Sequence, residues 1–242
     1  MATRVIAHRT CPRHAVENSL AGIRVAAGLG ADLVEVDVRR TRDGLPVLMH
    51  DRTPRRTAGS RLPLRRLASA RVAGLRLRGE LPGGGETLPS LVDALAAAPV
   101  PLGFALDVKD PGAGPATLAA VRDAGMGDRV LLWSQHEPVV RFCAREAPEV
   151  EVSLLRDTSD ASSTRRLLDE AREWGARGVS VHQGVLDADL VAEAHGRGLS
   201  VYCWFQQLSV QEARLAKAAT FGLDGVVTDW VAEARAALDA LG

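Results

Sequence analysis

Short apolar runs rich in valine and leucine alternate with longer stretches of helical periodicity along most of the chain. The apolar runs predict strands at residues 4–8, 33–38, 102–108, 129–133, 150–155, 178–182, 199–204 and 224–228. The other stretches predict helices at residues 18–29, 90–98, 116–124, 137–146, 162–174, 187–196, 209–219 and 230–241. Strands that alternate with helices form βαβ units, so the pattern predicts an α/β fold with a parallel sheet.

Eight strands and eight helices within 242 residues favour a closed, parallel, eight-stranded (β/α)8 TIM barrel. An open doubly wound sheet is the alternative, but no glycine-rich dinucleotide-binding sequence opens the first helix. We expect a single domain over residues 1–242 with an irregular loop insertion at about 52–88. The insertion follows the second strand and a short extended piece at 47–50, so it should lie at the C-terminal face of the barrel.

The composition argues against several classes of partner. Lys+Arg and Asp+Glu both total 30, which indicates neither a basic nucleic-acid-binding surface nor a basic membrane-binding helix. No apolar stretch has the length of a signal peptide or a membrane span. The three cysteines, Cys11, Cys143 and Cys203, lack metal-ligand spacing. They predict reduced thiols and a cytoplasmic location.

Two carboxylates in the second predicted strand indicate a metal site. Alternation along a strand turns Glu35 and Asp37 toward the barrel axis and the intervening valines toward the helices. A solvated edge or a salt bridge would also explain an acidic pair, but the flanking valines indicate a buried parallel strand. Asp107 has the same orientation in the next strand and is a candidate third ligand. Oxygen ligands favour Mg²⁺ or Ca²⁺ over zinc.

His8 and His50 are the candidate acid and base. Each ends a predicted extended segment, and barrel enzymes place catalytic groups at the C-terminal ends of strands. Histidine also titrates closest to neutral pH. The other four histidines are expected to have structural or surface roles, His182 least securely because it also ends a strand. Together with the carboxylates, the two histidines suggest metal-assisted phosphoryl transfer.

The roles of three further positions remain open at this level. Arg9 would lie at the barrel mouth, where an arginine can hold a phosphate, and Lys109 would lie at the rim as a phosphate or carboxylate partner. Only two of the 30 basic residues are lysine, which hints that arginine would not serve at position 109. Trp204 would either pack in the core or form an apolar wall for a substrate. Glu17 and Asn18 would either satisfy the free amides at the start of the first helix or, in the case of Asn18, bind the metal.

The chain resembles the glycerophosphodiester phosphodiesterases over nearly its whole length. The most specific blocks lie near the N-terminus and include residues 6–9, 17–20, 30–38, 41–44 and 47–51. Weaker similarity continues through residues 88–91, 106–109, 198–204 and 222–229. The resemblance implies a TIM barrel that uses Mg²⁺ or Ca²⁺ to hydrolyse small-molecule glycerophosphodiesters to glycerol 3-phosphate and an alcohol, as part of lipid metabolism.

The resemblance also implies roles for individual residues. His8 and His50 become the acid/base pair, Arg9 and Lys109 contact phosphate, and the metal ligands are Glu35, Asp37 and Asp107. The chain departs from the family pattern at Thr10, where glycine is usual, at Asp107, where glutamate is usual, and at residues 205–207. Thr10 is expected to alter the geometry of its loop and the access of substrate, and the changes after Trp204 are expected to alter the headgroup pocket, whereas Asp107 is compatible with metal binding. The alternatives are a lysophospholipase D-type or cyclising reaction on a phospholipid, and a barrel that binds a phosphorylated ligand without turnover.

Overall fold

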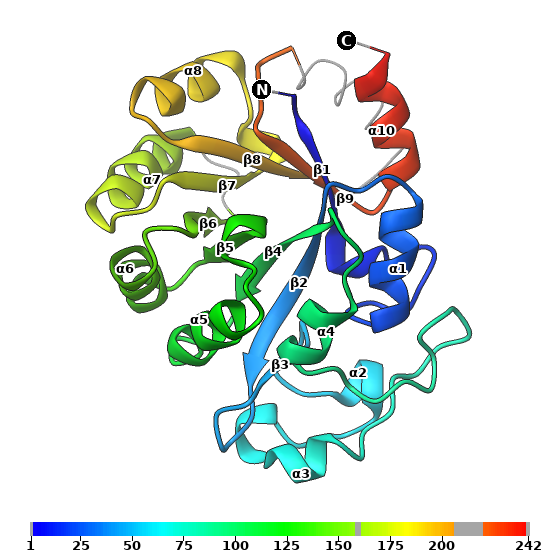
Figure 1. Ribbon diagram of the computed structural model, residues 1–242. Coiled ribbons are helices and arrows are strands. Elements are labelled where there is room, and N and C mark those ends of the chain that lie inside the picture. Colours follow the sequence, from blue (N-terminus) through cyan, green and yellow to red (C-terminus); the bar gives the residue numbers. More distant parts are fainter. Residues whose placement is uncertain (1, 158–160, 206–219, 241–242) are drawn as a thin grey trace.

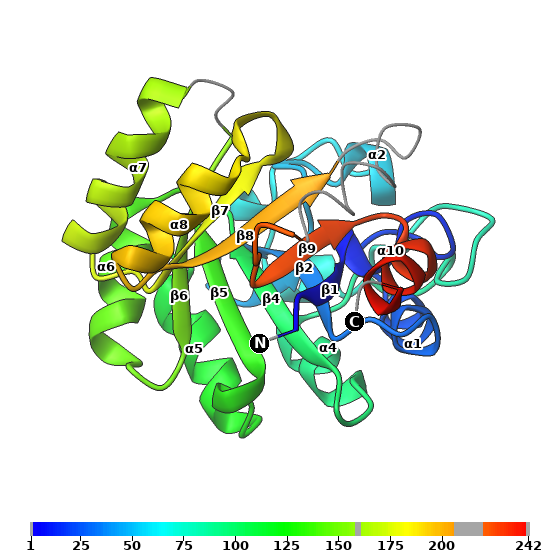
Figure 2. The ribbon, with the colours of Figure 1, turned by 90° about the horizontal axis from the view of Figure 1, so that it is seen from above.

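The computed structural model describes residues 2–157, 161–205 and 220–240 and forms a closed parallel barrel (Figure 1). The barrel strands are β1 (Arg4–Ala7), β2 (Leu33–Arg40), β4 (Gly103–Val108), β5 (Val130–Ser134), β6 (Glu151–Arg156), β7 (Gly178–His182), β8 (Ser200–Phe205) and β9 (Gly225–Thr228). Each of the eight pairs with its neighbours in parallel, and β1 closes the ring between β9 and β2 (Figure 2). The predicted (β/α)8 fold is confirmed.

Helices surround the barrel on its outer side (Figure 1). They are α1 (Leu20–Gly28), α4 (Leu91–Ala97), α5 (Gly114–Asp123), α6 (Glu137–Glu146), α7 (Ala161–Glu173), α8 (Ala188–Gly196) and α10 (Val231–Asp239). The helix predicted at 209–219 lies outside the described residues. Within the part of the chain that the structure describes, no helix has both the length and the apolar character needed to cross a bilayer.

Strand alternation divides the core into two layers. Val34, Val36 and Val38 pack in the large cluster between the sheet and the helices. Leu33 packs inside the barrel with residues such as Trp133 and Tyr202. The predicted orientation of the second strand is therefore confirmed, and Glu35 and Asp37 share the inner face with Leu33 because side chains alternate with a period of two.

Strand β2 continues past the end predicted for it and forms a hairpin. Its first six residues pair with β4, and the chain then turns back as β3 (Pro46–Leu48), antiparallel to β2. The pairing of Val38 with Leu48 and a 2.8 Å bond from the Met49 amide to the Asp37 carbonyl continue this ladder. The extended piece expected at 47–50 thus runs back toward the barrel and carries His50 with it.

The insertion at 52–88 is more regular than predicted. It contains the short helices α2 (Arg55–Ala58) and α3 (Ser69–Val72) and a 3₁₀ turn at Leu64–Arg66. The insertion also packs against β3 in a small apolar cluster. The cluster consists of Val16, Val47, Met49, Leu64, Leu67, Val72, Leu77 and Leu88. Scattered leucines and valines, rather than helical periodicity, build this cluster, which explains why the sequence pattern did not predict it.

The loop after β1 has an unusual backbone. Arg9, Thr10 and Cys11 have positive φ values of 43°, 62° and 74°. Thr10 is fully buried and its Oγ1 accepts a hydrogen bond from the Ser19 amide over 3.3 Å. A Cβ atom at Gly22 would lie 2.4 Å from both the carbonyl oxygen and Oγ1 of Thr10. The fold therefore accommodates Thr10 by placing a glycine opposite it in α1.

Candidate functional site

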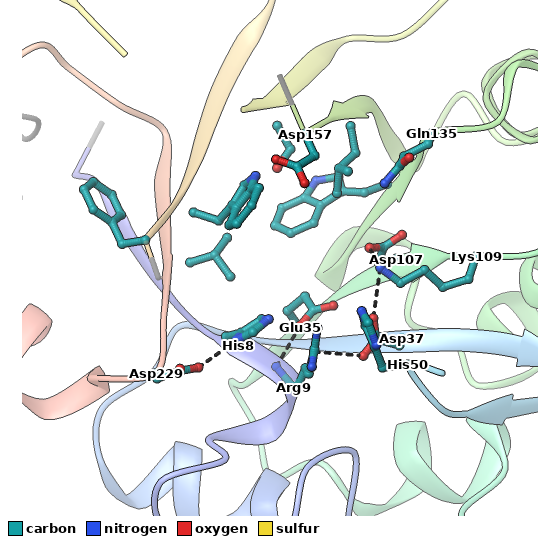
Figure 3. Close-up of a pocket in the computed structure, with 16 residues that line it drawn as sticks. His8, Arg9, Glu35, Asp37, His50, Asp107, Lys109, Gln135, Asp157 and Asp229 are labelled. Atoms are coloured by element: carbon teal, nitrogen blue, oxygen red, sulfur yellow. Dashed lines mark hydrogen bonds and ion pairs between the residues drawn. The ribbon is translucent and has the colours of Figure 1, made fainter. Parts of the chain in front are cut away.

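One cavity of about 380 Å³ contains all eight residues predicted for the site (Figure 3). They are His8, Arg9, Glu35, Asp37, His50, Asp107, Lys109 and Trp204. The cavity opens at the carboxyl ends of the strands, because His8 directly follows β1 and Lys109 directly follows β4. This is the face on which TIM barrels build active sites. The structure brings these residues together, while their individual roles stay predictions.

Three buried carboxylates form the centre of the cavity. Ligand oxygens of Glu35, Asp37 and Asp107 all lie within 4.8 Å of one another. Lys109 Nζ lies 3.1 Å from Asp37 Oδ1 and also contacts Asp107 Oδ2. Arg9 Nε lies 3.5 Å from Asp37 Oδ2. Two cations thus face three carboxylates, which leaves one acidic group without a matching positive charge.

The pKa values express this imbalance. Burial, reinforced by the Asp37 charge, raises the pKa of Glu35 to about 7. Burial likewise raises the pKa of Asp107, although Lys109 opposes the shift. Burial also acts on Asp37, but Lys109 and Arg9 outweigh it and lower the pKa of that carboxyl. A further cation in the cavity would therefore stabilise the ionised forms of Glu35 and Asp107.

The donor set fits a hard divalent cation. All three residues offer carboxylate oxygens, and Asp107 Oδ1 is buried without a hydrogen-bond partner. A buried unpaired carboxylate oxygen is costly, and a bound cation would compensate it. Oxygen ligands of this type suit Mg²⁺ or Ca²⁺. Asp107, which is one methylene shorter than the glutamate that the resemblance leads us to expect, still reaches the other two carboxylates.

Asn18 does not begin the first helix. Its φ is 55°, which is incompatible with a right-handed helix, and α1 starts at Leu20 with Ser19 as its N-cap. The Asn18 amide instead donates from Nδ2 to Asp37 Oδ2 over 2.9 Å. Glu17 does not satisfy helix amides either, because its carboxylate pairs with Arg56. The prediction of a helix start at these two residues is wrong.

His8 is held by a residue that sequence reasoning missed. Its Nδ1 lies 2.6 Å from Asp229 Oδ1. The signal was available in the strand pairing: Ala7 of β1 lies opposite Thr228 of β9, so the next residues, His8 and Asp229, emerge side by side. Burial lowers the pKa of His8, but the hydrogen bond to Asp229 and the Glu35 charge outweigh it, and the pKa is raised overall.

His50 reaches the cavity by a different route from the one expected. It does not end a parallel barrel strand but follows the antiparallel strand β3. Its Nδ1 lies 2.9 Å from Asp51 Oδ1. A carboxylate only accepts hydrogen bonds, so Nδ1 carries the proton in this pair, as it does in His8, and Nε2 is the nitrogen left for chemistry. Burial opposes ionisation of Asp51, but hydrogen bonds from Arg56 and His50 lower its pKa to about 2.

The remaining wall of the cavity is largely apolar. It consists of Trp133, Leu155, Trp204, Phe205 and Val227. Trp204 packs edge-on against the His182 ring with centroids 4.5 Å apart. It also packs against the cluster inside the barrel and lines the cavity, so its position combines the two arrangements that the sequence left open. Gln135 and Asp157, which the sequence did not single out, lie across the cavity from His8 (Figure 3). Of the departure at 205–207, residues 206 and 207 lie outside the described residues.

The family model described as the glycerophosphoryl diester phosphodiesterase family matches residues 8–233. The chain belongs to this family. Among curated relatives, the glycerophosphodiester phosphodiesterase of Caldanaerobacter subterraneus subsp. tengcongensis is 26% identical over 244 residues and covers 95% of both chains. As a member of the family, the protein is a phosphodiesterase whose TIM barrel carries an acidic cluster able to bind a metal.

Solved structures of the same family share the fold. A glycerophosphodiester phosphodiesterase from Parabacteroides distasonis superposes with a TM-score of 0.83 at 22% identity, covering 99% of this chain and 98% of that one. An Oleispira antarctica phosphodiesterase, solved in complex with the product sn-glycerol-3-phosphate, has a TM-score of 0.81 at 24% identity and covers 98% and 97% of the two chains. At these identities the likeness establishes the barrel architecture.

Proposed function

We propose that this phosphodiesterase hydrolyses glycerophosphodiesters to sn-glycerol 3-phosphate and an alcohol, by acid/base catalysis with two histidines and with Mg²⁺ or Ca²⁺. The observation that carries the proposal is the meeting of His8 and His50 with three buried carboxylates in one cavity. The product bound to the Oleispira antarctica relative supports the choice of substrate class.

Glu35, Asp37 and Asp107 would hold the cation. Bound there, it supplies positive charge that stabilises the phosphodiester oxygens as negative charge builds up on them. Arg9 and Lys109, which line the same cavity, add cationic hydrogen-bond donors for the remaining phosphate oxygens. The apolar wall around Trp204 would cover the carbon skeleton of the substrate and exclude water from it.

The two histidines divide the proton transfers. The pKa of His8 is raised, which favours His8 as the acid that protonates the leaving alkoxide from Nε2. His50 would then accept the proton from the attacking oxygen through its own Nε2. That oxygen belongs either to water or to the glycerol 2-hydroxyl, and the second case gives a cyclic phosphate before glycerol 3-phosphate.

A metal-supplemented activity panel tests the proposal. Purified protein is incubated with Mg²⁺ or Ca²⁺ and with glycerophosphocholine, -ethanolamine, -glycerol, -inositol, lysophosphatidylcholine or an aryl phosphodiester, and products are identified by phosphorus NMR. We expect glycerol 3-phosphate, and no turnover in EDTA. His8→Ala and His50→Ala should each lower kcat/KM on the order of a thousandfold, whereas the exposed His14→Ala serves as control. Cleavage of none of these substrates would refute the proposal, and release of a cyclic phosphate from the lysophospholipid alone would assign the cyclising alternative.

We further propose a cytoplasmic role in lipid metabolism. Cys11, Cys143 and Cys203 are all free and buried, which agrees with the reduced thiols expected in that compartment. Fractionation of cells that express a tagged copy, with measurement of accumulated glycerophosphodiesters after deletion, tests this prediction.

A further inference from the structure

Arg56 links the insertion to the site through two carboxylates. It lies on α2, and its Nε donates to Asp51 Oδ2 over 2.9 Å. The other two nitrogens of its guanidinium donate to the Glu17 carboxylate over 2.5 and 2.7 Å. All three nitrogens of the group are therefore engaged, although Arg56 itself does not line the cavity.

Each of these carboxylates contacts a residue of the site. Asp51 Oδ1 lies 2.9 Å from His50 Nδ1, and Glu17 Oε1 lies 4.0 Å from the nearest guanidinium nitrogen of Arg9. Asp51 thus binds the histidine with one oxygen and Arg56 with the other. This arrangement holds the carboxylate plane in one orientation, which a lone hydrogen bond to His50 would not do.

We infer that Arg56 is a positioning residue, which fixes Asp51 so that His50 keeps its proton on Nδ1 and presents Nε2 to the substrate. The inference rests on the proposed role of His50 in catalysis. The insertion would then have a role in catalysis, because its helix α2 supplies the cation that orients His50 after the end of β3.

The geometry requires a guanidinium at this position. A planar fork with donors on two edges can contact Asp51 and Glu17 at once, whereas an ammonium is a single point charge. The Arg56 side chain is 51% exposed, and exposed ion pairs contribute little to stability. Loss of Arg56 should therefore affect the orientation of His50 more than the folding of the chain.

The experiment compares Arg56→Gln and Arg56→Lys with Arg55→Gln, a matched change at the exposed neighbour on the same helix. We expect Arg56→Gln to lower kcat about tenfold and to change KM less than twofold. Arg56→Lys should recover only a small part of the lost kcat. Arg55→Gln should have the kcat and KM of the wild type. Because Arg56 acts through Asp51, Arg56→Gln should cause no further loss in an Asp51→Asn background.

Equal kcat values for Arg56→Gln and Arg55→Gln would overturn the inference, as would effects of Arg56→Gln and Asp51→Asn that simply multiply. Nitrogen NMR of the His50 imidazole gives a second readout that needs no turnover. We expect a single Nδ1–H tautomer in the wild type and a mixture in Arg56→Gln. A wild type without activity would refute the proposed function, while an unchanged tautomer in Arg56→Gln would refute this inference alone.

Discussion

Asn18 holds Asp37 by two hydrogen bonds. Its Nδ2 donates to Asp37 Oδ2 over 2.9 Å, and its Oδ1 accepts from the Asp37 backbone amide over 3.0 Å. Both residues are buried, so water does not compete for these bonds. The Asn18 amide thereby fixes the carboxylate of a proposed metal ligand, and its φ of 55° is the backbone conformation that aims it there.

Replacing this amide should weaken metal binding. Asn18→Gly keeps a residue that tolerates positive φ but removes both side-chain bonds, and we expect a 10- to 100-fold loss of Mg²⁺ or Ca²⁺ affinity by titration calorimetry, about the loss typical for such supporting partners. The neighbouring Ser19→Ala removes only the helix N-cap. It should cost about 1 kcal/mol of stability and leave the affinity within twofold. Equal affinities for both variants would contradict the role of Asn18.

The bond between His8 and Asp229 should control the alkaline limb of the pH–rate profile, where the general acid loses its proton. Asp229→Asn removes the carboxylate whose hydrogen bond and charge help to raise the pKa of His8. His8 then loses its proton at lower pH, so the alkaline fall of kcat should move to lower pH. We also expect kcat to drop roughly 10- to 100-fold, with KM little changed. A pH–rate profile measures both effects.

A second Asp–His pair provides the control. Asp224 lies 3.0 Å from His195 and accepts from the Val201 amide over 2.7 Å, and neither member lines the cavity. Asp224→Asn should lower the thermal midpoint and leave the pH–rate profile unchanged. If both variants shift the profile alike, Asp229 has no specific effect on His8.

Metal affinity should depend on pH through Glu35. Its pKa is raised from 4.5 to about 7, so between these values the folded, metal-free protein binds more protons than the unfolded chain. Stability without metal should therefore fall as pH rises through this window. A cation competes with that proton, so its affinity should strengthen about tenfold per pH unit up to 7.

Thermal unfolding in EDTA and in Mg²⁺ from pH 5 to 8 measures both trends. Glu35→Gln has no carboxyl group that titrates at this position, so its metal-free stability should depend less on pH than that of the wild type. Metal-free stability that rises between pH 5 and 7 would show that the Glu35 pKa is not raised.

The contact between Gly22 and Thr10 predicts different costs for two glycines of one helix. Gly22→Ala places a Cβ 2.4 Å from Thr10, and such overpacking should destabilise the fold by about 1–3 kcal/mol. At Gly28, a Cβ meets nothing within 4 Å, so Gly28→Ala should stabilise by roughly 0.5 kcal/mol. Urea unfolding compares the two, and equal effects would mean that the loop after β1 yields to the added methyl group.

Local patterns predicted the barrel and the inner face of its strands. The period of two along β2 is sufficient to turn Glu35 and Asp37 inward, because each side chain's direction depends only on its position in the strand. Parallel pairing of β2 with β4 then sets Asp37 opposite Asp107. The acidic cluster could therefore be predicted from residues within two short segments.

Other features of the site depend on how distant segments meet. His8 and Asp229 are 221 positions apart and become neighbours only because β1 closes the barrel against β9. His50 enters the cavity because β2 extends past the barrel rim and folds back, and Asn18 points at Asp37 because its backbone is left-handed. His50 pairs with Asp51, its neighbour in the sequence. Side-chain periodicity contains no information about barrel closure and left-handed turns, so the tertiary structure decided that Asp229 holds His8 and that Asn18 holds Asp37.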